Sequence, residues 1–225
     1  MRQRRRHHTD ERLLLSSTYF IETPDCPVNA LEAVKRKAYI DWDGIFGVRR
    51  PISLEIGCGK GSFAVEYARR HPDENVVAVE RNANVILAAM ENAEANKLPN
   101  LRLLHLPCEV LTRYFRPESV EKIFLNFSTP LPRAPFVRQR LTNPRFLALY
   151  DEMLQAGGEI RLKTDSEPFF SYSLEEITNY GFTVTRAETD LYKTDLIETN
   201  IATEYENRFV KQGLPIFAIV ARKEK

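Results

Sequence analysis

The chain has 225 residues and a formal net charge of +1, and 43% of its residues are hydrophobic and 28% charged. These values are typical of a globular protein, and the length suffices for one α/β domain with a substantial core. No apolar run approaches the roughly 20 residues of a membrane-spanning helix, so we expect neither a membrane span nor a signal peptide. The three cysteines lack the spacing of a zinc site or a disulfide framework, which favours a cytoplasmic protein.

The first 50 residues differ in character from the rest of the chain. They show no clean periodicity, and four arginines cluster at the start: Arg2, Arg4, Arg5 and Arg6. We expect a basic N-terminal arm with a short helix near residues 30–39, followed by the main domain over residues 51–225. The arm either acts as a solubilising tail or contacts a phosphate backbone.

From residue 51 onward, apolar runs alternate with amphipathic segments. The expected strands are 52–56, 76–79, 101–106, 122–126, 159–163, 182–187 and 216–221, and the expected helices are 62–70, 83–96, 144–154, 168–180 and 203–211. Gly157-Gly158 and Gly181 are expected to terminate two of these helices. The alternation predicts a Rossmann-like α/β fold, with a mostly parallel seven-stranded sheet and helices on both faces. In such sheets ligands bind at the carboxyl ends of the strands.

Residues 54–61 carry the most informative motif. Glu55 lies near the end of an apolar strand, and Gly57, Gly59 and Gly61 follow before an amphipathic helix. Glycines in this place permit positive φ and let the backbone approach a nucleotide-like ligand closely. An acid at the strand end disfavours phosphate and favours a ligand with amine and hydroxyl groups, such as S-adenosylmethionine.

Two other ligands of glycine-rich turns fit the sequence less well. A phosphate P-loop needs Ser or Thr directly after Gly-Lys, but Gly61 follows Lys60. A nicotinamide dinucleotide site needs a third glycine where this chain has Ser62. Glu80, at the end of the second expected strand, can accept hydrogen bonds from both ribose hydroxyls in either cofactor class. The turn therefore favours S-adenosylmethionine, whereas Glu80 does not discriminate.

Three further motifs lie in the second half of the chain. They are Asn126-Phe127-Ser128-Thr129-Pro130-Leu131-Pro132-Arg133, Lys163-Thr164-Asp165 and Thr203-Glu204-Tyr205-Glu206. In this order, together with the turn after Glu55 and the Met1-Arg2 start, the chain resembles the bacterial tRNA (guanine-N7-)-methyltransferases. The likeness runs over essentially the whole chain.

The resemblance implies a class I S-adenosylmethionine-dependent methyltransferase that acts on N7 of a variable-loop guanine of tRNA, position 46 (EC 2.1.1.33). It implies tRNA and S-adenosylmethionine as partners, a monomer or homodimer, and a cytoplasmic location. The implied cofactor-binding residues are Glu55, Gly57, Gly59, Gly61, Glu80 and Glu109. The implied substrate-binding residues are Arg133, Asp165, Thr203, Glu204, Tyr205 and Glu206, and the implied catalytic residues are Asp165 and Thr129.

The chain departs from the family pattern at several of these positions. Thr129 stands where the family has aspartate, and Leu131 where it has tryptophan. Residues 134–137 interrupt the family's basic run. The family also has an aspartate near the adenine after the third strand, and Glu109 is the acid in this chain that can take its place.

These departures leave the predicted chemistry possible, since N7 of guanine carries a lone pair and no proton, and its methylation needs no general base. The enzyme has to align N7 with the sulfonium methyl and to stabilise positive charge that develops on the guanine ring. Loss of the acid at Thr129 is therefore expected to weaken or retune activity. Two alternatives stay open: an inactive relative that binds tRNA or cofactor, and a small-molecule methyltransferase that has lost the RNA surface.

Several motif residues also have a purely structural interpretation. Asp165 could cap the following helix, and Thr203 with Glu206 has the spacing of a capping box. Lys163 could be a charge at the edge of a strand. The histidines show no catalytic or metal-binding pattern, and no metal is expected.

Overall fold

The computed structural model describes residues 18–23, 32 and 35–224. The arginine cluster at the start and residues 30, 31, 33 and 34 of the helix expected near residues 30–39 lie outside the described residues. The chain divides into two compact units, residues 1–115 and 116–225, which we describe in turn. The boundary that the sequence predicts after residue 50 stays a prediction.

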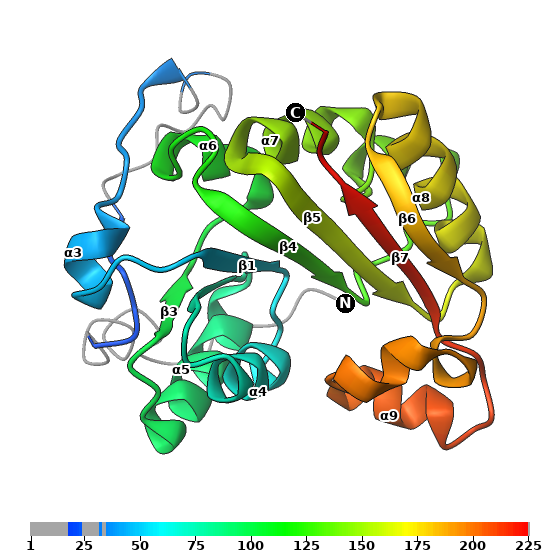
Figure 1. Ribbon diagram of the computed structural model, residues 1–225, viewed down its shortest axis with the longest axis horizontal. Coiled ribbons are helices and arrows are strands. Elements are labelled where there is room, and N and C mark those ends of the chain that lie inside the picture. The colour runs from blue at the N-terminus through cyan, green and yellow to red at the C-terminus, as the bar shows by residue number, and fades with distance from the viewer. Residues whose placement is uncertain (1–17, 24–31, 33–34, 225) are drawn as a thin grey trace. The chain divides into compact units, whose positions relative to one another are not determined.

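The first unit contains three parallel strands in the order β3-β2-β1: β1 (Ile52–Ile56), β2 (Asn75–Val79) and β3 (Leu101–Leu104). Helices α4 (Ser62–Arg70) and α5 (Ala83–Asn96) connect them (Figure 1). Every residue of β1 and β2 is buried. This explains why most of their residues are apolar, because central parallel strands are covered on both faces. From residue 51 onward, the strands and helices predicted for this unit are confirmed, with β3 ending two residues early. The helix expected near residues 30–39 does not extend to residue 39, because the described residues 36–39 are not helical.

Three short helices in this unit were not predicted: α3 (Trp42–Phe46), the 3-10 helix η1 (Cys108–Val110) and α6 (Leu111–Tyr114). The segment before β1 also makes specific contacts. Ile21 N donates to Leu103 O at 3.0 Å, and the Trp42 ring stacks on Phe115 with centroids 5.0 Å apart. The described parts of the expected arm therefore pack against β3 and α6.

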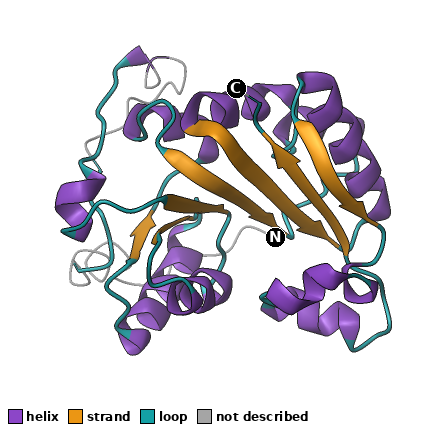
Figure 2. Ribbon diagram, in the orientation of Figure 1, coloured by secondary structure: helices purple, strands orange, loops and turns teal. Residues whose placement is uncertain are grey.

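The second unit contains four strands in the order β4-β5-β7-β6: β4 (Val120–Asn126), β5 (Leu154–Thr164), β6 (Thr183–Glu188) and β7 (Phe217–Arg222). β4 and β5 are parallel, and β7 is antiparallel to both β5 and β6. Helices α7 (Pro144–Met153), α8 (Glu167–Tyr180) and α9 (Glu204–Val210) alternate with these strands (Figure 2). The seven strands confirm the expected Rossmann-like, mostly parallel seven-stranded sheet.

Three 3-10 helices, η2 (Ala134–Gln139), η3 (Leu191–Lys193) and η4 (Asp195–Thr199), complete the second unit and were not predicted. They lie in segments rich in proline or in polar residues, where no helical periodicity extends far enough to be recognised. η2 directly follows the motif after β4, and η3 and η4 lie between β6 and the Thr203 motif.

The expected helix end at Gly157-Gly158 is wrong. α7 ends at Met153, and β5 begins at the next residue and runs through both glycines. A Cβ atom at Gly158 would lie 2.9 Å from both Gln155 O and Glu121 O, so a close backbone approach requires this glycine. Gly181, by contrast, ends α8 with φ of 111°, as predicted.

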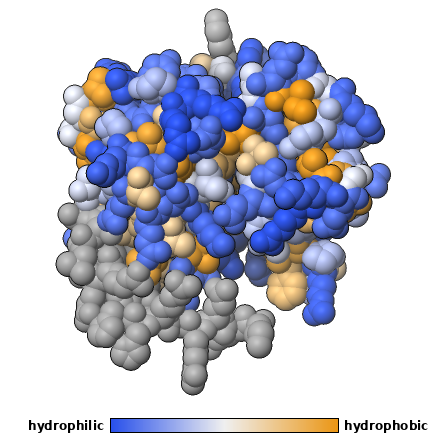
Figure 3. All heavy atoms as spheres, turned by 90° about the horizontal axis from the view of Figure 1, so that it is seen from below, coloured by the Kyte–Doolittle hydropathy of each residue, from blue (hydrophilic) through white to orange (hydrophobic). Residues whose placement is uncertain are grey.

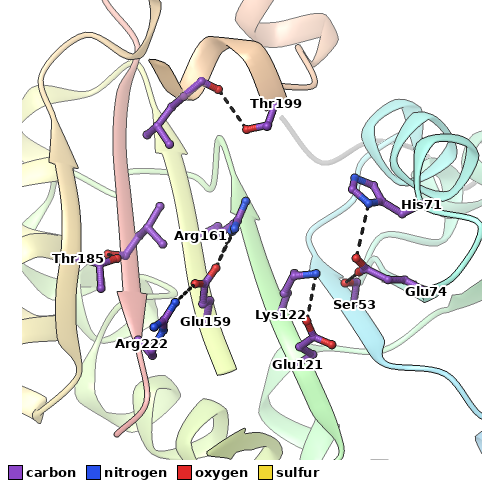
Figure 4. A network of polar contacts seen from close by, with 12 residues as sticks. Ser53, His71, Glu74, Glu121, Lys122, Glu159, Arg161, Thr185, Thr199 and Arg222 are labelled. Carbon is purple, nitrogen blue, oxygen red and sulfur yellow. Dashed lines mark hydrogen bonds and ion pairs between the residues drawn. The ribbon is translucent and has the colours of Figure 1, made fainter. Parts of the chain in front are cut away.

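Ion pairs on β5 and β7 help to fix the register of this sheet. Arg222 lies opposite Glu159 across the antiparallel pair and donates to it at 2.8 Å, and Arg161 donates to the same carboxylate at 2.8 Å (Figure 4). In the first unit, Ser53 donates to Glu74 at 2.5 Å. Each unit thus has its own polar contacts on and around its strands.

Polar side chains dominate the part of the surface that is coloured in Figure 3. In the face drawn in Figure 3, hydrophobic residues occur in small groups among hydrophilic ones. Within the described residues, no helix is long and apolar enough to cross a membrane. The same part of the chain has no group of three or more His, Cys, Asp or Glu side chains that could hold a metal ion.

Candidate active site

The glycine turn after β1 has the backbone conformation that the sequence predicts. Gly57, Gly59 and Gly61 have φ of 79°, 58° and 76°, a region that residues with a Cβ atom rarely adopt. The backbone N–H groups of Gly57 and Cys58 both donate to Val79 O, at 2.8 and 3.0 Å. These bonds hold the turn against the carboxyl end of β2.

The three glycines differ in what surrounds them. A Cβ atom at Gly57 or Gly59 would meet nothing within 4 Å, whereas one at Gly61 would lie 3.0 Å from the Cβ of Ala89 on α5. Gly61 therefore permits close helix packing. Gly57 and Gly59 leave open space beside the backbone, which is the arrangement a nucleotide-like ligand needs.

Two acidic residues lie beside this turn: Glu55 precedes it in the sequence, and Glu80 contacts it in space. Glu55 is part of β1 and is 3% exposed. Glu80 directly follows β2, and its carboxylate accepts from Gly59 N at 3.3 Å and from Asn82 N at 2.8 Å. Each carboxylate oxygen can accept a further hydrogen bond. The turn thus presents fixed acceptors, which fit a ligand that carries amine and hydroxyl donors.

The thiol of Cys58 lies between these acids in the sequence and is buried. Burial, followed by the charges of Glu55 and Glu80, raises the pKa of the Cys58 thiol well above its usual value. The thiol therefore stays protonated and is a poor nucleophile.

Glu109 lies in η1, a short distance along the chain after β3, and is half-buried. Cys108 before it is buried. The expected role of Glu109 beside the adenine stays a prediction.

In the second unit, the loop after β4 has an unusual backbone. Phe127 and Leu131 have φ of 52° and 46°, although neither is glycine. Such conformations cost free energy and are concentrated at functional sites. Thr129 and Arg133 are exposed. In the described part of the chain, Ser128 Oγ is buried without a hydrogen-bond partner.

Asp165 follows the last residue of β5 and is exposed. It is not the cap of α8, because the next residue, Ser166, is the N-cap and its side chain accepts from Phe169 N at 3.3 Å. The structural interpretation of Asp165 as a cap is therefore wrong, and its carboxylate extends from the end of the strand.

The Thr203–Glu206 motif forms the capping box that its spacing predicts. Thr203 Oγ1 accepts from Glu206 N at 3.0 Å, and Glu206 Oε2 accepts from Thr203 N at 3.3 Å. Thr203 is 8% exposed and Glu206 is fully buried. Glu204 and Tyr205 between them are exposed, with 60% of Tyr205 accessible. The motif thus combines two buried residues with two that face solvent.

Three side chains that the sequence did not link to Glu206 surround it. Lys163 Nζ, Tyr192 Oη and Asn200 Nδ2 lie 2.6, 3.0 and 2.5 Å from its carboxylate oxygens. Burial and the neighbouring Glu206 charge raise the pKa of Tyr192 to about 12. These partners are up to 43 residues away in sequence, so only the folded chain brings them together.

Comparison with known proteins relates these features to a family. Residues 49–219 match the family model of a putative methyltransferase. The chain is 42% identical to a tRNA (guanine-N(7)-)-methyltransferase of Geobacillus thermodenitrificans, over 78% of this chain and 81% of that protein. It is 38% identical to one of Lachnoclostridium phytofermentans, over 93% of this chain and 96% of that protein.

The chain belongs to the tRNA (guanine-N7-)-methyltransferase family.

Solved structures agree on the fold. The 16S rRNA methyltransferase KamB matches with a TM-score of 0.63 at 16% identity, over 84% of this chain and 96% of that one. A Haemonchus contortus phosphoethanolamine N-methyltransferase in complex with S-adenosyl-L-methionine matches with a TM-score of 0.52 at 15% identity, over 80% of this chain and 50% of that one. At these identities the likeness establishes the class I methyltransferase fold.

The residues expected from the family motifs fall into two sets. The cofactor set lies in the first unit, around the turn after β1 and the end of β2. The substrate set lies in the second unit, at the ends of β4 and β5 and at the start of α9. Sequence reasoning missed Lys163, Tyr192 and Asn200, which surround Glu206. It interpreted Lys163 as a charge at a strand edge, but Lys163 is 8% exposed and pairs with Glu206.

Proposed function

We propose that this protein transfers a methyl group from S-adenosylmethionine to N7 of a guanine in tRNA, and that the target is guanine 46 of the variable loop (EC 2.1.1.33). The observation that carries the proposal is the 38% identity to a tRNA (guanine-N(7)-)-methyltransferase over nearly the full length of both chains. A tRNA substrate also implies a cytoplasmic location.

The first unit would hold the cofactor. Glu80 would accept the ribose hydroxyls, Glu55 the amino group, and Gly57 and Gly59 would let the backbone lie close to the ligand. Gly61 would support the turn through its packing on α5, and Glu109 would lie on the adenine side. S-adenosylmethionine supplies the electrophilic methyl group. Two carboxylates near the turn would also favour a cationic sulfonium over its neutral product.

The second unit would hold the guanine. Asp165 is exposed at the end of β5 and can accept hydrogen bonds from the N1–H and amino groups of guanine. Its negative charge would stabilise the positive charge that develops on the ring as N7 attacks the methyl carbon. Thr129 can accept or donate one hydrogen bond but supplies no charge. Arg133, exposed at the start of η2, would contact a phosphate.

The Thr203–Glu206 motif would contribute in two ways. Glu204 and Tyr205 are exposed and can contact the nucleotide directly. Glu206 already accepts from three side chains and from a backbone N–H, so contact with guanine would require one of these partners to move. We therefore assign Glu206 first to supporting Thr203 and its neighbours, and its contact with guanine stays a prediction.

Mass-spectrometric mapping of tRNA after incubation with protein and S-adenosylmethionine tests the function. We expect 7-methylguanosine at one variable-loop position. Unmodified tRNA transcripts serve as substrate, and a transcript with adenine at that position serves as the matched control. Absence of 7-methylguanosine from all guanines would refute the proposal.

Two other functions have separate motivations. The substituted motif at Thr129 and Leu131 motivates an inactive relative, and the interrupted basic run at residues 134–137 with the net charge of +1 motivates a small-molecule methyltransferase. An inactive relative would bind tRNA or adenosylhomocysteine without transferring methyl groups. A small-molecule methyltransferase would show little dependence of KM on salt. Binding of tRNA, by contrast, weakens steeply with added salt because counterions are released from the phosphates. The product analysis and a salt titration of KM together separate the three.

A further inference from the structure

The side chain of Lys163 is buried at the end of β5 and contacts the segment before α9. Its ammonium group lies 2.9 Å from Asn200 Oδ1, 2.8 Å from Ile201 O and 2.6 Å from Glu206 Oε2. An ammonium group has three N–H donors, so these three acceptors match its full capacity. Lys163 thereby ties the strand that ends at Asp165 to the start of the Thr203 motif.

The acceptor side of this contact is equally complete. Glu206 is fully buried, and its two oxygens also accept from Tyr192 Oη, Asn200 Nδ2 and Thr203 N. Because so many donors bind this buried carboxylate, it has one low-energy orientation. The start of α9 is therefore held both by the capping box of Thr203 and Glu206 and by the ammonium group of Lys163 from β5.

The backbone of Lys163 makes a second connection. Its carbonyl oxygen accepts from Phe127 N at 2.8 Å, at the positive-φ residue that starts the loop after β4. The Phe127 ring in turn stacks on Phe209 of α9, with centroids 6.2 Å apart and planes 9° apart. One residue thus contacts all three segments assigned to the substrate: the loop with Thr129 and Arg133, the strand end with Asp165, and the Thr203 motif.

We propose that Lys163 is a positioning residue that holds these three segments in one arrangement before tRNA binds. This inference rests on the proposed function, because it assigns a role within the same site. A buried ion pair is seldom more stabilising than a well-packed apolar pair, so stability alone gives little reason for a lysine in this place. The pair does define geometry, because its hydrogen bonds are satisfied in one arrangement only.

The test compares two lysine-to-methionine variants of the full-length protein. Lys163→Met removes the three donors and keeps a long, unbranched side chain. Lys223→Met is the matched control, because Lys223 Nζ also binds backbone carbonyl oxygens, of Asp151 and Leu154, at 2.6 and 2.9 Å. Leu154 lies nine residues before Lys163 on β5, which is about 30 Å along the strand.

We expect Lys163→Met to lower kcat/KM for tRNA about 10²-fold, the effect of displacing reacting groups by about 1 Å. Affinity for adenosylhomocysteine should change by less than about twofold, because the proposed cofactor residues belong to the other unit. Hydrogen exchange of the amides of residues 200–207 should become faster. Lys223→Met should keep the wild-type kcat/KM and the wild-type exchange in that segment.

The proposal is overturned if Lys163→Met lowers kcat/KM no more than Lys223→Met does, or if exchange over residues 200–207 is unchanged. Tyr192→Phe is a milder second variant in case Lys163→Met fails to fold. It removes only the hydroxyl that donates to Glu206, and we expect a fall in kcat/KM of about fivefold. Equal wild-type activity in Tyr192→Phe would also count against the proposal.

Failure of the proposed function gives a different result. If wild-type protein does not methylate tRNA, the proposed function is wrong whatever the variants do. Hydrogen exchange then still tests whether Lys163 orders residues 200–207, because this measurement needs neither substrate nor turnover.

Discussion

Asp165 lies at the end of β5 with its carboxylate exposed, and Ser166 provides the helix cap beside it. Because Asp165 is not needed as a helix cap, its carboxylate can bind a ligand. The same holds for Thr129, which is exposed in a loop with positive-φ residues on both sides. At the scale of single residues, the site therefore combines buried supporting groups with exposed polar groups.

Asp165→Asn keeps the shape of the side chain and removes its charge. We expect kcat for tRNA methylation to fall about 10²-fold, the usual effect of losing one group that stabilises transition-state charge. Affinity for adenosylhomocysteine should not change. Glu167→Gln, at an exposed acid on the first turn of α8, is the control and should retain full activity. Equal activity of the two variants would remove Asp165 from the catalytic role.

Thr129→Asp restores the acid that the family has in this position. Because Thr129 is exposed, the new carboxylate does not have to be buried. If it lies near the guanine, kcat should rise by up to about tenfold, which corresponds to about 1.4 kcal/mol. Thr129→Ala is the control and should change kcat much less. A fall in kcat for Thr129→Asp would show that this chain has retuned its site for an uncharged residue.

At the scale of elements, the glycines of the turn after β1 have two different roles: Gly61 allows close packing on α5, and Gly59 leaves space for a ligand. Gly59→Ala and Gly61→Ala each place a Cβ atom at positive φ, at a cost of about 1–2 kcal/mol. Only at Gly61 would the new atom also collide with Ala89. We expect Gly61→Ala to be the less stable variant in denaturant unfolding.

Gly59→Ala should instead weaken cofactor binding, because its Cβ atom would enter the open space beside the turn. Calorimetry with adenosylhomocysteine should show a Kd at least about tenfold higher than that of the wild type. An unchanged Kd for Gly59→Ala would place the ligand elsewhere.

The contact between β5 and β7 gives a pH prediction. Burial would raise the pKa of Glu159, but hydrogen bonds and charges from Arg222 and Arg161 outweigh it and hold the pKa below the usual value of 4.5. A carboxyl with a lowered pKa in the folded state stabilises that state above its unfolded pKa and loses this contribution as pH falls.

Glu159→Gln should therefore be less stable than wild type at pH 7, and the difference should shrink as pH falls below about 4.5. Urea unfolding at a series of pH values measures this difference. Glu121→Gln, on the neighbouring strand, is the control, since its contact with Lys122 is a partly exposed pair at 3.2 Å. A difference for Glu159→Gln that grows on acidification would contradict the assigned ion pairs.

At the scale of the whole molecule, a net charge of +1 provides no general attraction to RNA. Local charge can provide it. Residues 123–150 contain four arginines and no acidic residue. Arg140 is engaged internally, because its guanidinium donates to Pro130 O at 2.9 Å and lies over the Tyr172 ring. Arg133 and Arg138 are exposed and are the candidates for phosphate contacts.

Arg133→Ala and Arg138→Ala should each weaken tRNA binding and reduce the slope of log K against log salt concentration by about one. Arg116→Ala is the control, because Arg116 is also exposed and in the same unit but precedes β4, whereas Arg133 and Arg138 follow that strand. Binding measured between about 50 and 200 mM salt tests this. Slopes identical to the wild type would exclude these arginines from contact with phosphates.

The sequence was sufficient for features that depend on neighbouring residues. β1, α4 and α5 have the predicted bounds, because burial pattern and end residues are local properties. The capping box at Thr203 and the glycine turn were predicted for the same reason. Gly157-Gly158 shows the limit: a glycine pair after a helical segment is typical of a helix end, but a backbone contact with Glu121 required one of these glycines inside a strand.

The surroundings of the proposed substrate residues came from contacts between distant segments. Lys163 was interpreted as a charge at a strand edge because no pattern in the sequence links it to Glu206, which lies 2.6 Å away across 43 residues. Asp165 was interpreted as a possible helix cap because it stands at the start of α8, but the next residue, Ser166, is the N-cap. Motifs therefore indicated which residues are candidates for the reaction, and folding determined which of these candidates are exposed, since burial and hydrogen-bond partners exist only in three dimensions.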